Sequence, residues 1–220
     1  MSASQPQGYL ALPTSGAGRG VLVLHAWWGL NDTIKAFCNR LAEAGFTAFA
    51  ADLYHGQIAA TIPEAEKLRD AMEIQQARAD IAEAVSFLSQ CAALADQGLA
   101  VIGFSLGASF ALALSAAQPK LIRSAVVFYG TGPVDFSAAQ AAYLGHFAEK
   151  DVFESNEDVN ALEQSLHAAG RPVTFHHYPG TGHWFFEPDR TDAYNPAAAS
   201  LAWERTLAFL KETLPHEPKK

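Results

Sequence analysis

Short uninterrupted apolar runs alternate along the chain with stretches in which apolar residues recur at helical spacing. The runs predict buried strands at residues 21–24, 46–51, 99–104, 125–129, 142–147 and 173–178. Continuous apolar character, rather than an alternating pattern, is typical of strands that are buried on both faces. The sequence therefore predicts an α/β fold with a mostly parallel sheet and helices on both faces, and residues 9–12 are a candidate edge strand.

The segments between these runs carry helical patterns. A helix is expected from about Asp32 to Ala44, with Asn31 or Asp32 as its N-cap and Gly45 as its stop. The region between the second and third runs is also helical. Further helices are expected at residues 108–117, at residues 159–169 and from residue 195 onward.

Two of these helices have a face that we expect to be buried. In the helical region between the second and third runs, the face carries Ile74, Ala77, Ile81, Val85 and Leu88. In the last helix, which begins with the capping pair Asn195-Pro196, it carries Trp203, Leu207 and Leu210.

Length and composition fit a globular chain. The 220 residues suit one large domain, residues 1–220, with residues 1–8 as a flexible N-terminal tail. Hydrophobic residues make up 50% and charged residues 17%, which argues against disorder. The formal net charge of −8 disfavours nucleic acid and anionic membrane surfaces as partners, because binding phosphates requires basic patches.

The N-terminal sequence and the cysteine spacing favour a cytoplasmic location. Residues 1–8 have neither the basic nor the apolar segment of a signal peptide, and no apolar run is long enough to cross a membrane. Cys38 and Cys91 form no redox or metal-binding spacing. We expect two reduced thiols, with a disulfide between them as the alternative.

The segment Gly103-Phe-Ser105-Leu-Gly107 follows one apolar run and precedes a helical pattern. A strand, a sharp turn that carries a serine and then a helix make the context of a nucleophile elbow. Glycines two residues before and two residues after the serine relieve crowding in so tight a turn. The Ser105 hydroxyl is then presented at a helix N-terminus, where developing negative charge is favoured.

A serine nucleophile needs a base, and the base needs an acid that orients it. Asp151 follows the fifth apolar run and His183 follows the sixth, so both come after strand ends. Ligands bind at the carboxyl ends of parallel strands, which places these side chains at one edge of the sheet. The order Ser105, Asp151, His183 is that of the α/β-hydrolases, whose fold we therefore predict.

Other residues compete for the roles of acid and base. Glu149 and Asp135 also lie in loops that follow strands, so each is an alternative acid. His146, His176 and His177 lie inside expected strands, where a structural role is the alternative to catalysis. Four further histidines are less suited: His25 precedes the serine, and His55, His167 and His216 have the sequence context of surface residues.

The tetrahedral intermediate also needs donors for its oxyanion. One candidate is the backbone N–H of Leu106, directly after the serine, and the other is the N–H of Trp27, in the loop after the first strand. Aromatic residues near these loops are candidates for the walls of a substrate pocket: His25, Trp28, Trp184 and Phe185.

Taken together and in order, these motifs resemble the dienelactone hydrolase family of small single-domain α/β-hydrolases. The resemblance extends from about Gly20 to Leu214 and is carried by residues 25–31, 51–54, 103–107, 146–151 and 178–183. It implies a triad of Ser105, Asp151 and His183, with no metal and no organic cofactor.

This chain departs from the family pattern at three positions. The enzymes that name the family carry a cysteine in the elbow, where this chain has Ser105, and a glutamate at the position of Ala26. They also hold a substrate carboxylate with an arginine shortly after the catalytic histidine, where this chain has residues 186–188, Phe-Glu-Pro. Other candidates for a substrate carboxylate are Arg69, Arg78 and Arg190.

These observations predict a hydrolase that cleaves small carboxylic esters or lactones through a serine nucleophile. The connection between the fourth and fifth strands is too short for a helical cap, which predicts an open cleft for a small-molecule substrate. The alternatives are a thioesterase or peptidase with the same triad, or a non-catalytic ligand-binding relative.

Overall fold

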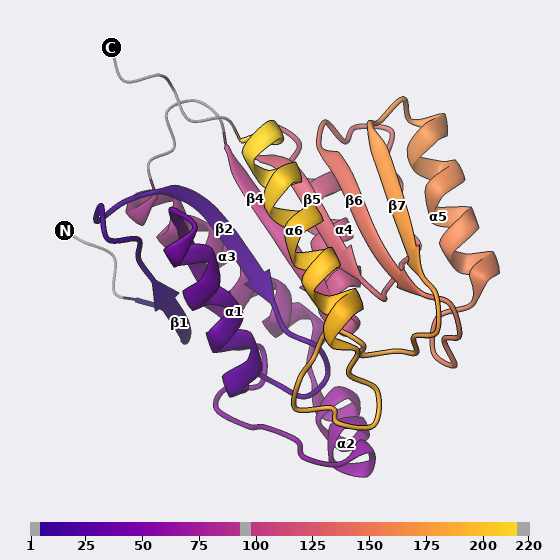
Figure 1. The fold of residues 1–220 in the computed structure, drawn as a ribbon. Helices are drawn as coiled ribbons and strands as arrows, with labels where there is room; N and C mark the ends of the chain where they lie inside the picture. The colour runs from indigo at the N-terminus through magenta and orange to yellow at the C-terminus, as the bar shows by residue number, and fades with distance from the viewer. Residues whose placement is uncertain (1–4, 93–97, 215–220) are drawn as a thin grey trace. The chain divides into compact units, whose positions relative to one another are not determined.

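The computed structural model describes residues 5–92 and 98–214. The chain divides into two compact units, residues 1–99 and residues 100–220. In the described residues, both units contain strands that are connected mostly through helices (Figure 1). The α/β class and the mostly parallel strand pairing are confirmed. The single domain predicted for residues 1–220 stays a prediction, and part of the predicted tail, residues 1–4, lies outside the described residues. The tail prediction is wrong at Gly8, which pairs with Ala51 in a strand.

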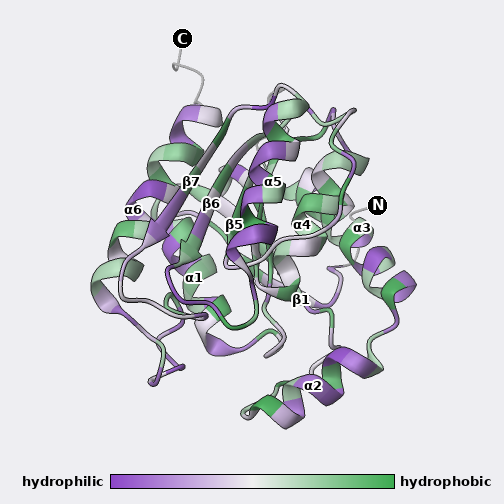
Figure 2. Cartoon of the chain, turned by 90° about the vertical axis from the view of Figure 1, so that its right-hand side faces the viewer, coloured by the Kyte–Doolittle hydropathy of each residue, from purple (hydrophilic) through white to green (hydrophobic). Residues whose placement is uncertain are grey.

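The first unit consists of β1 (Gly8–Ala11), β2 (Arg19–Leu24), α1 (Asp32–Glu43), β3 (Phe46–Ala51), α2 (Ile62–Ala71) and α3 (Ile74–Cys91). Its strands are ordered β1-β3-β2, with β2 parallel to β3 and β1 antiparallel to it, so the candidate edge strand is present. Every residue of β2 and β3 is buried. Helices α1 and α3 lie on opposite faces of these strands (Figures 1 and 2), which explains why both strands are apolar except at Arg19 and Thr47.

Helix α1 begins and ends where the sequence predicts. The Asn31 side chain accepts a hydrogen bond from the Ile34 N–H at 3.1 Å, which satisfies one of the free donors of the first turn. Gly45 follows the helix with φ of 95°, a left-handed conformation that glycine adopts without strain. Both helix ends are thus set by local chemistry.

Replacing Asn31 with alanine should lower the free energy of unfolding by about 1 kcal/mol, because the Ile34 N–H loses its acceptor. Denaturant unfolding measures the change. Glu43→Ala, an exposed position at the other end of α1, is the control and should shift stability by less than about 0.5 kcal/mol. Equal effects of the two substitutions would contradict the capping role.

The second unit consists of β4 (Leu99–Phe104), α4 (Leu106–Ala117), β5 (Ile122–Phe128), β6 (Ala142–Ala148), α5 (Asn156–Ala168), β7 (Val173–Tyr178) and α6 (Pro196–Thr213). Its strands are ordered β4-β5-β6-β7, and β5, β6 and β7 run parallel. Helix α6 covers one face of them, and α4 and α5 cover the other (Figures 1 and 2). The connection from β5 to β6, residues 129–141, contains neither helix nor strand, as expected for a fold without a cap at this position.

The predicted buried faces of two helices need correction. In α3 the face is as predicted except at Ile74, which is exposed because it is the first residue of the helix. In α6, Trp203 and Leu207 are only half-buried, and the buried positions are Ala199, Ala202, Thr206 and Leu210. Small side chains on this face let the helix approach the strands closely, which moves the two larger residues to its flanks.

Cys38 lies buried in α1, and Cys91 ends α3 in a half-buried position. Both thiols are free, so the alternative of a disulfide between them is wrong. Burial raises the pKa of the Cys38 thiol to about 12, which makes that side chain unreactive. None of the helices among the described residues is long and apolar enough to cross a membrane.

Candidate active site

Ser105 occupies the turn between β4 and α4. Its φ is 48°, a left-handed conformation that costs a residue with a side chain about 1–3 kcal/mol. A side chain at Gly103 would overlap the carbonyl oxygen of Gly107, so the turn requires glycine there. The Ser105 N–H donates to the Phe128 carbonyl at 2.9 Å, which ties the turn to the end of β5. The predicted strand-turn-helix geometry is therefore present.

Ser105, His183 and Asp151 are brought together from three loops. The Ser105 Oγ lies 2.8 Å from His183 Nε2, and His183 Nδ1 lies 2.7 and 2.9 Å from the two Asp151 carboxylate oxygens. Only 3% of the His183 side chain and 6% of the Asp151 side chain are exposed. Because an ionised carboxylate only accepts hydrogen bonds, Nδ1 carries the ring proton and Nε2 is left to accept the proton of the serine.

The Asp151 carboxylate is fixed by its own loop as well as by the imidazole. Its Oδ1 accepts the backbone N–H of Phe153 at 2.9 Å and that of Glu154 at 3.0 Å. An aspartate side chain is short enough to close such a turn onto the following amides. The carboxylate is thus held in place to face His183.

The loops that carry Asp151 and His183 are joined to each other. The Lys150 N–H donates to the Thr181 carbonyl at 3.0 Å, and the Gly180 N–H donates to the Glu149 carboxylate at 2.8 Å. Glu149, one alternative acid, therefore joins the two loops through the Gly180 N–H, whereas Asp151 contacts the His183 imidazole. The other alternative, Asp135, is exposed and accepts the N–H of Ser137.

His146 has the contacts of a structural histidine. It is fully buried in β6, and its Nδ1 and Nε2 lie 2.8 Å from the Tyr178 hydroxyl and 3.0 Å from the Thr206 hydroxyl. Burial is the main reason that its pKa lies well below the usual value, so the ring is neutral. Among the other histidines, His176 is half-buried, His177, His55 and His167 are exposed, and His216 lies outside the described residues.

Two of the predicted pocket residues, His25 and Trp28, lie in the first unit. His25 is fully buried, its Nε2 accepts the Leu53 N–H at 3.1 Å, and its Nδ1 lies 2.7 Å from the Ala26 carbonyl. Burial lowers its pKa, in agreement with a neutral ring that donates from Nδ1. Trp28 is buried and its ring packs edge-on against that of Trp27. These contacts support the fold of the loop after β2.

The other two predicted pocket residues, Trp184 and Phe185, follow His183 in the second unit. Phe185 is fully buried and its ring packs against those of Tyr129 and Tyr178. The Trp184 ring lies edge-on to His183, with 5.0 Å between centroids, and is largely buried. Trp184 therefore packs against the imidazole directly, whereas Phe185 packs against Tyr129, whose ring lies 4.9 Å from that of His183.

Leu106 is the first residue of α4, where backbone N–H groups have no acceptor within the helix. Its N–H is thus available beside Ser105, as the predicted oxyanion donor requires. Trp27 belongs to the first unit, and its role as second donor stays a prediction.

One group that the sequence did not single out is the Phe153 side chain. Its ring lies 5.0 Å from the His183 ring and 5.0 Å from the Trp184 ring, measured between centroids. It is 47% exposed, which is unusual for so large an apolar side chain. The sequence signal was available, because two apolar residues, Val152 and Phe153, directly follow the predicted acid in a loop.

A second overlooked group is the buried carboxyl of Glu187. One of its oxygens accepts the Tyr129 hydroxyl at 2.7 Å, and the other, Oε2, is buried with no hydrogen-bond partner among the described residues. Burial is the main cause that raises its pKa to about 8, with the charge of Asp189 adding to the effect. The Tyr129 ring in turn lies 4.9 Å from that of His183.

Two of the candidate arginines are paired with a neighbouring aspartate: Arg69 with Asp70 at 2.8 Å, and Arg190 with Asp189 at 2.9 Å. Arg78 is exposed on α3. In the part of the chain that the structure describes, no cluster of three or more histidine, cysteine or acidic side chains could hold a metal ion.

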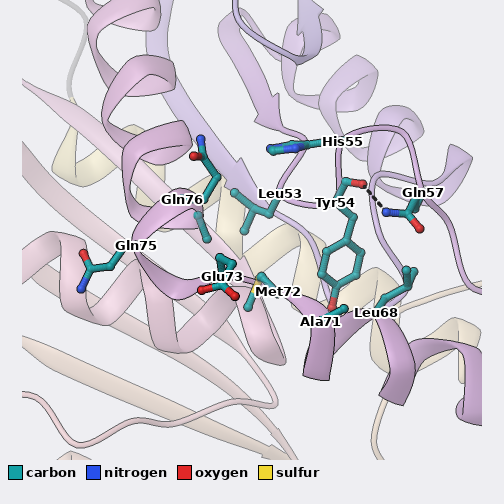
Figure 3. A pocket seen from close by; sticks show the side chains of 11 residues that line it. Leu53, Tyr54, His55, Gln57, Leu68, Ala71, Met72, Glu73, Gln75 and Gln76 are labelled. Carbon is teal, nitrogen blue, oxygen red and sulfur yellow. Dashed lines mark hydrogen bonds between the residues drawn. The ribbon is translucent and has the colours of Figure 1, made fainter.

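A cavity of about 500 Å³ lies in the first unit, between the loop after β3 and helices α2 and α3 (Figure 3). Its walls include Leu53, Tyr54, Leu68 and Met72, with glutamine side chains at its edge. Ser105, Asp151 and His183 do not line it.

Comparison with known proteins identifies the family. A family model described as the dienelactone hydrolase family matches residues 7–214. The chain belongs to the dienelactone hydrolase family. Members of this family are hydrolases, so this protein is an enzyme of that class, and the resemblance drawn from the sequence is confirmed.

Individual relatives of this dienelactone hydrolase family member match along nearly their whole length. Protein usf of Aquifex pyrophilus is 36% identical over 217 residues, which cover 94% of each chain. A putative carboxymethylenebutenolidase of Aquifex aeolicus is 33% identical over 219 residues, again 94% of each chain. The crystal structure of a putative dienelactone hydrolase from Klebsiella pneumoniae is 26% identical and matches with a TM-score of 0.82, over 95% of this chain and 92% of that chain.

Proposed function

We propose that this family member hydrolyses small carboxylic esters or lactones through an acyl-enzyme formed on Ser105. The observation that carries the proposal is the unbroken series of hydrogen bonds from the Ser105 hydroxyl through His183 to Asp151, at 2.8 and 2.7 Å. The lactone alternative is further supported by the relative from Aquifex aeolicus, which is named as a putative carboxymethylenebutenolidase.

In the first half of the reaction, the Ser105 Oγ bonds to the substrate carbonyl carbon while its proton passes to His183 Nε2. The Leu106 N–H, at the start of α4, donates to the oxyanion that forms. When the tetrahedral intermediate collapses, the bond to the leaving oxygen breaks and that oxygen takes the proton from Nε2. The acyl group then remains on Ser105. While His183 carries the proton it is an imidazolium, which Asp151 stabilises.

In the second half, water attacks the acyl carbon and passes a proton to His183 Nε2. The bond from the acyl carbon to the Ser105 Oγ breaks, the Oγ recovers that proton, and the carboxylic acid leaves. A serine hydroxyl activated in this way needs no standing thiolate, which fits Ala26 at the position where cysteine enzymes of the family carry a glutamate.

Labelling with a fluorophosphonate probe, followed by peptide mapping, tests the proposal directly. We expect modification of Ser105 in the native protein and none after denaturation, because only the folded site activates the hydroxyl. Modification of a different residue, or none, would contradict the serine mechanism and favour the non-catalytic alternative. A panel of simple esters, acyl thioesters and peptides then separates an esterase from a thioesterase or peptidase.

We also propose that the enzyme works in the cytoplasm and that its substrate is a small molecule. The two free thiols support a reducing compartment. Because Cys38 is buried, a thiol-alkylating reagent should leave it unmodified in the native protein, as mass spectrometry would show.

A further inference from the structure

The loop after Asp151 exposes an aromatic ring beside the proposed base. The Phe153 ring contacts the rings of both His183 and Trp184, with 5.0 Å between centroids in each pair, yet 47% of the residue remains exposed. An aromatic side chain left half in solvent against two other rings offers a flat apolar surface to a ligand.

The backbone of this loop is fixed, so the ring is presented at a defined place. The Phe153 N–H and the Glu154 N–H both donate to Asp151 Oδ1, at 2.9 and 3.0 Å. The Glu154 carboxylate accepts the Thr131 hydroxyl at 2.7 Å, which anchors the far end of the turn. A substrate group that contacts Phe153 therefore gains from a surface that is already ordered.

The chemistry of the imidazole indicates which part of the substrate meets this ring. His183 Nε2 faces the Ser105 Oγ and must give its proton to the oxygen of the departing alcohol. The alcohol part of an ester thus passes beside the His183 ring, which Phe153 contacts. Asp151 and Glu154 make the same loop acidic, which favours an uncharged alcohol part over an anionic one.

We propose that Phe153 selects esters whose alcohol part carries an uncharged aromatic group. This inference rests on the function proposed above for Ser105, Asp151 and His183. It names a specificity-determining residue and a substrate class, aryl-substituted alcohol esters, rather than a further catalytic group.

Three esters test the proposal: benzyl acetate, ethyl acetate and ethyl phenylacetate. Benzyl and ethyl alcohol are both alkyl leaving groups, so the ratio of kcat/KM for the two acetates isolates recognition of the ring in the alcohol part. In Phe153→Ala this ratio should fall about 10-fold, the size of effect expected for loss of one good aromatic contact. Phe153→Trp, which keeps an aromatic surface, should retain at least half of the original ratio.

Val152→Ala is the matched control. Val152 precedes Phe153 in the same loop and is 88% exposed, so its substitution should change the ratio by less than twofold. An unchanged ratio in Phe153→Ala would overturn the proposal. A loss confined to ethyl phenylacetate would overturn it as well, because the ring would then be recognised in the acyl part.

Fluorophosphonate labelling of Ser105 distinguishes a failure of the role proposed for Phe153 from a failure of the proposed function. If the parent protein and Phe153→Ala are both labelled and the ratio of the two acetates does not change, only the role of Phe153 fails. If the parent is not labelled and hydrolyses none of the esters, the proposed function fails and the specificity proposal fails with it.

Discussion

Replacing Ser105 with alanine should lower kcat for ester hydrolysis by a factor of about 10³ or more, the loss seen when a triad nucleophile is removed. The variant keeps the oxyanion donor and the His183–Asp151 pair, but no acyl-enzyme can form. Steady-state kinetics on an activated acetate ester at saturating substrate measures the change. Alanine and serine both carry a Cβ, so the substitution should leave the backbone cost of the positive φ at this position unchanged.

The matched control for this prediction is Ser165→Ala. Ser165 is an exposed serine on α5 whose hydroxyl donates to the Ala161 carbonyl, so its loss should change kcat by less than twofold. A kcat in Ser105→Ala within about tenfold of the parent value would exclude Ser105 as the nucleophile.

Replacing Glu187 with glutamine should make the protein more stable at high pH and leave it almost unchanged at low pH. Glu187 is fully buried, and burial raises its pKa from the ordinary 4.5 to about 8. Below pH 4.5 the carboxyl is neutral in both the folded and unfolded states and has no effect on the pH dependence. As the pH rises from 4.5 to 8, the unfolded state releases this proton and the folded state retains it, so the native state loses stability.

The difference between a pKa of about 8 in the folded state and 4.5 in the unfolded state lowers the free energy of unfolding by roughly 4–5 kcal/mol at and above pH 8. Glutamine keeps the shape of the side chain and cannot ionise, so denaturant unfolding at pH 5 and pH 9 should show a stability gain only at pH 9. Glu204→Gln, an exposed carboxyl on α6, is the control and should show no such pH-dependent gain. A difference between Glu187→Gln and the parent that is the same at both pH values would mean that Glu187 is ionised in the folded protein.

The central strands could be predicted from the sequence because they are buried on both faces. Continuous apolar runs gave β3 and β4 with their observed bounds, and β2, β5 and β6 within three residues. The bounds of β7 were also predicted, but the prediction that it is a buried strand is wrong, because only Tyr178 among its residues is buried. The last helix was harder to interpret. Large apolar residues were expected on its buried face, but close packing against β5 and β6 selects small residues, and no pattern of hydropathy alone reveals that preference.

The site was predictable where strand ends and chain order constrain it, at Ser105 and His183. Asp151 was the predicted acid, but Glu149 and Asp135 stayed open as alternatives because they also follow strands. Only the three-dimensional path of the loops determines that Asp151 reaches the imidazole. Phe153 was missed because hydrophobic periodicity was used to find helices and strands, and the apolar pair Val152-Phe153 lies in a loop.

Asp151 serves two purposes, since one side chain both closes its loop through the amides of Phe153 and Glu154 and contacts His183. A longer glutamate could not fill both positions. Any replacement at this residue should therefore alter turnover and substrate preference at once, and a double-mutant cycle that pairs it with Phe153 should be strongly non-additive.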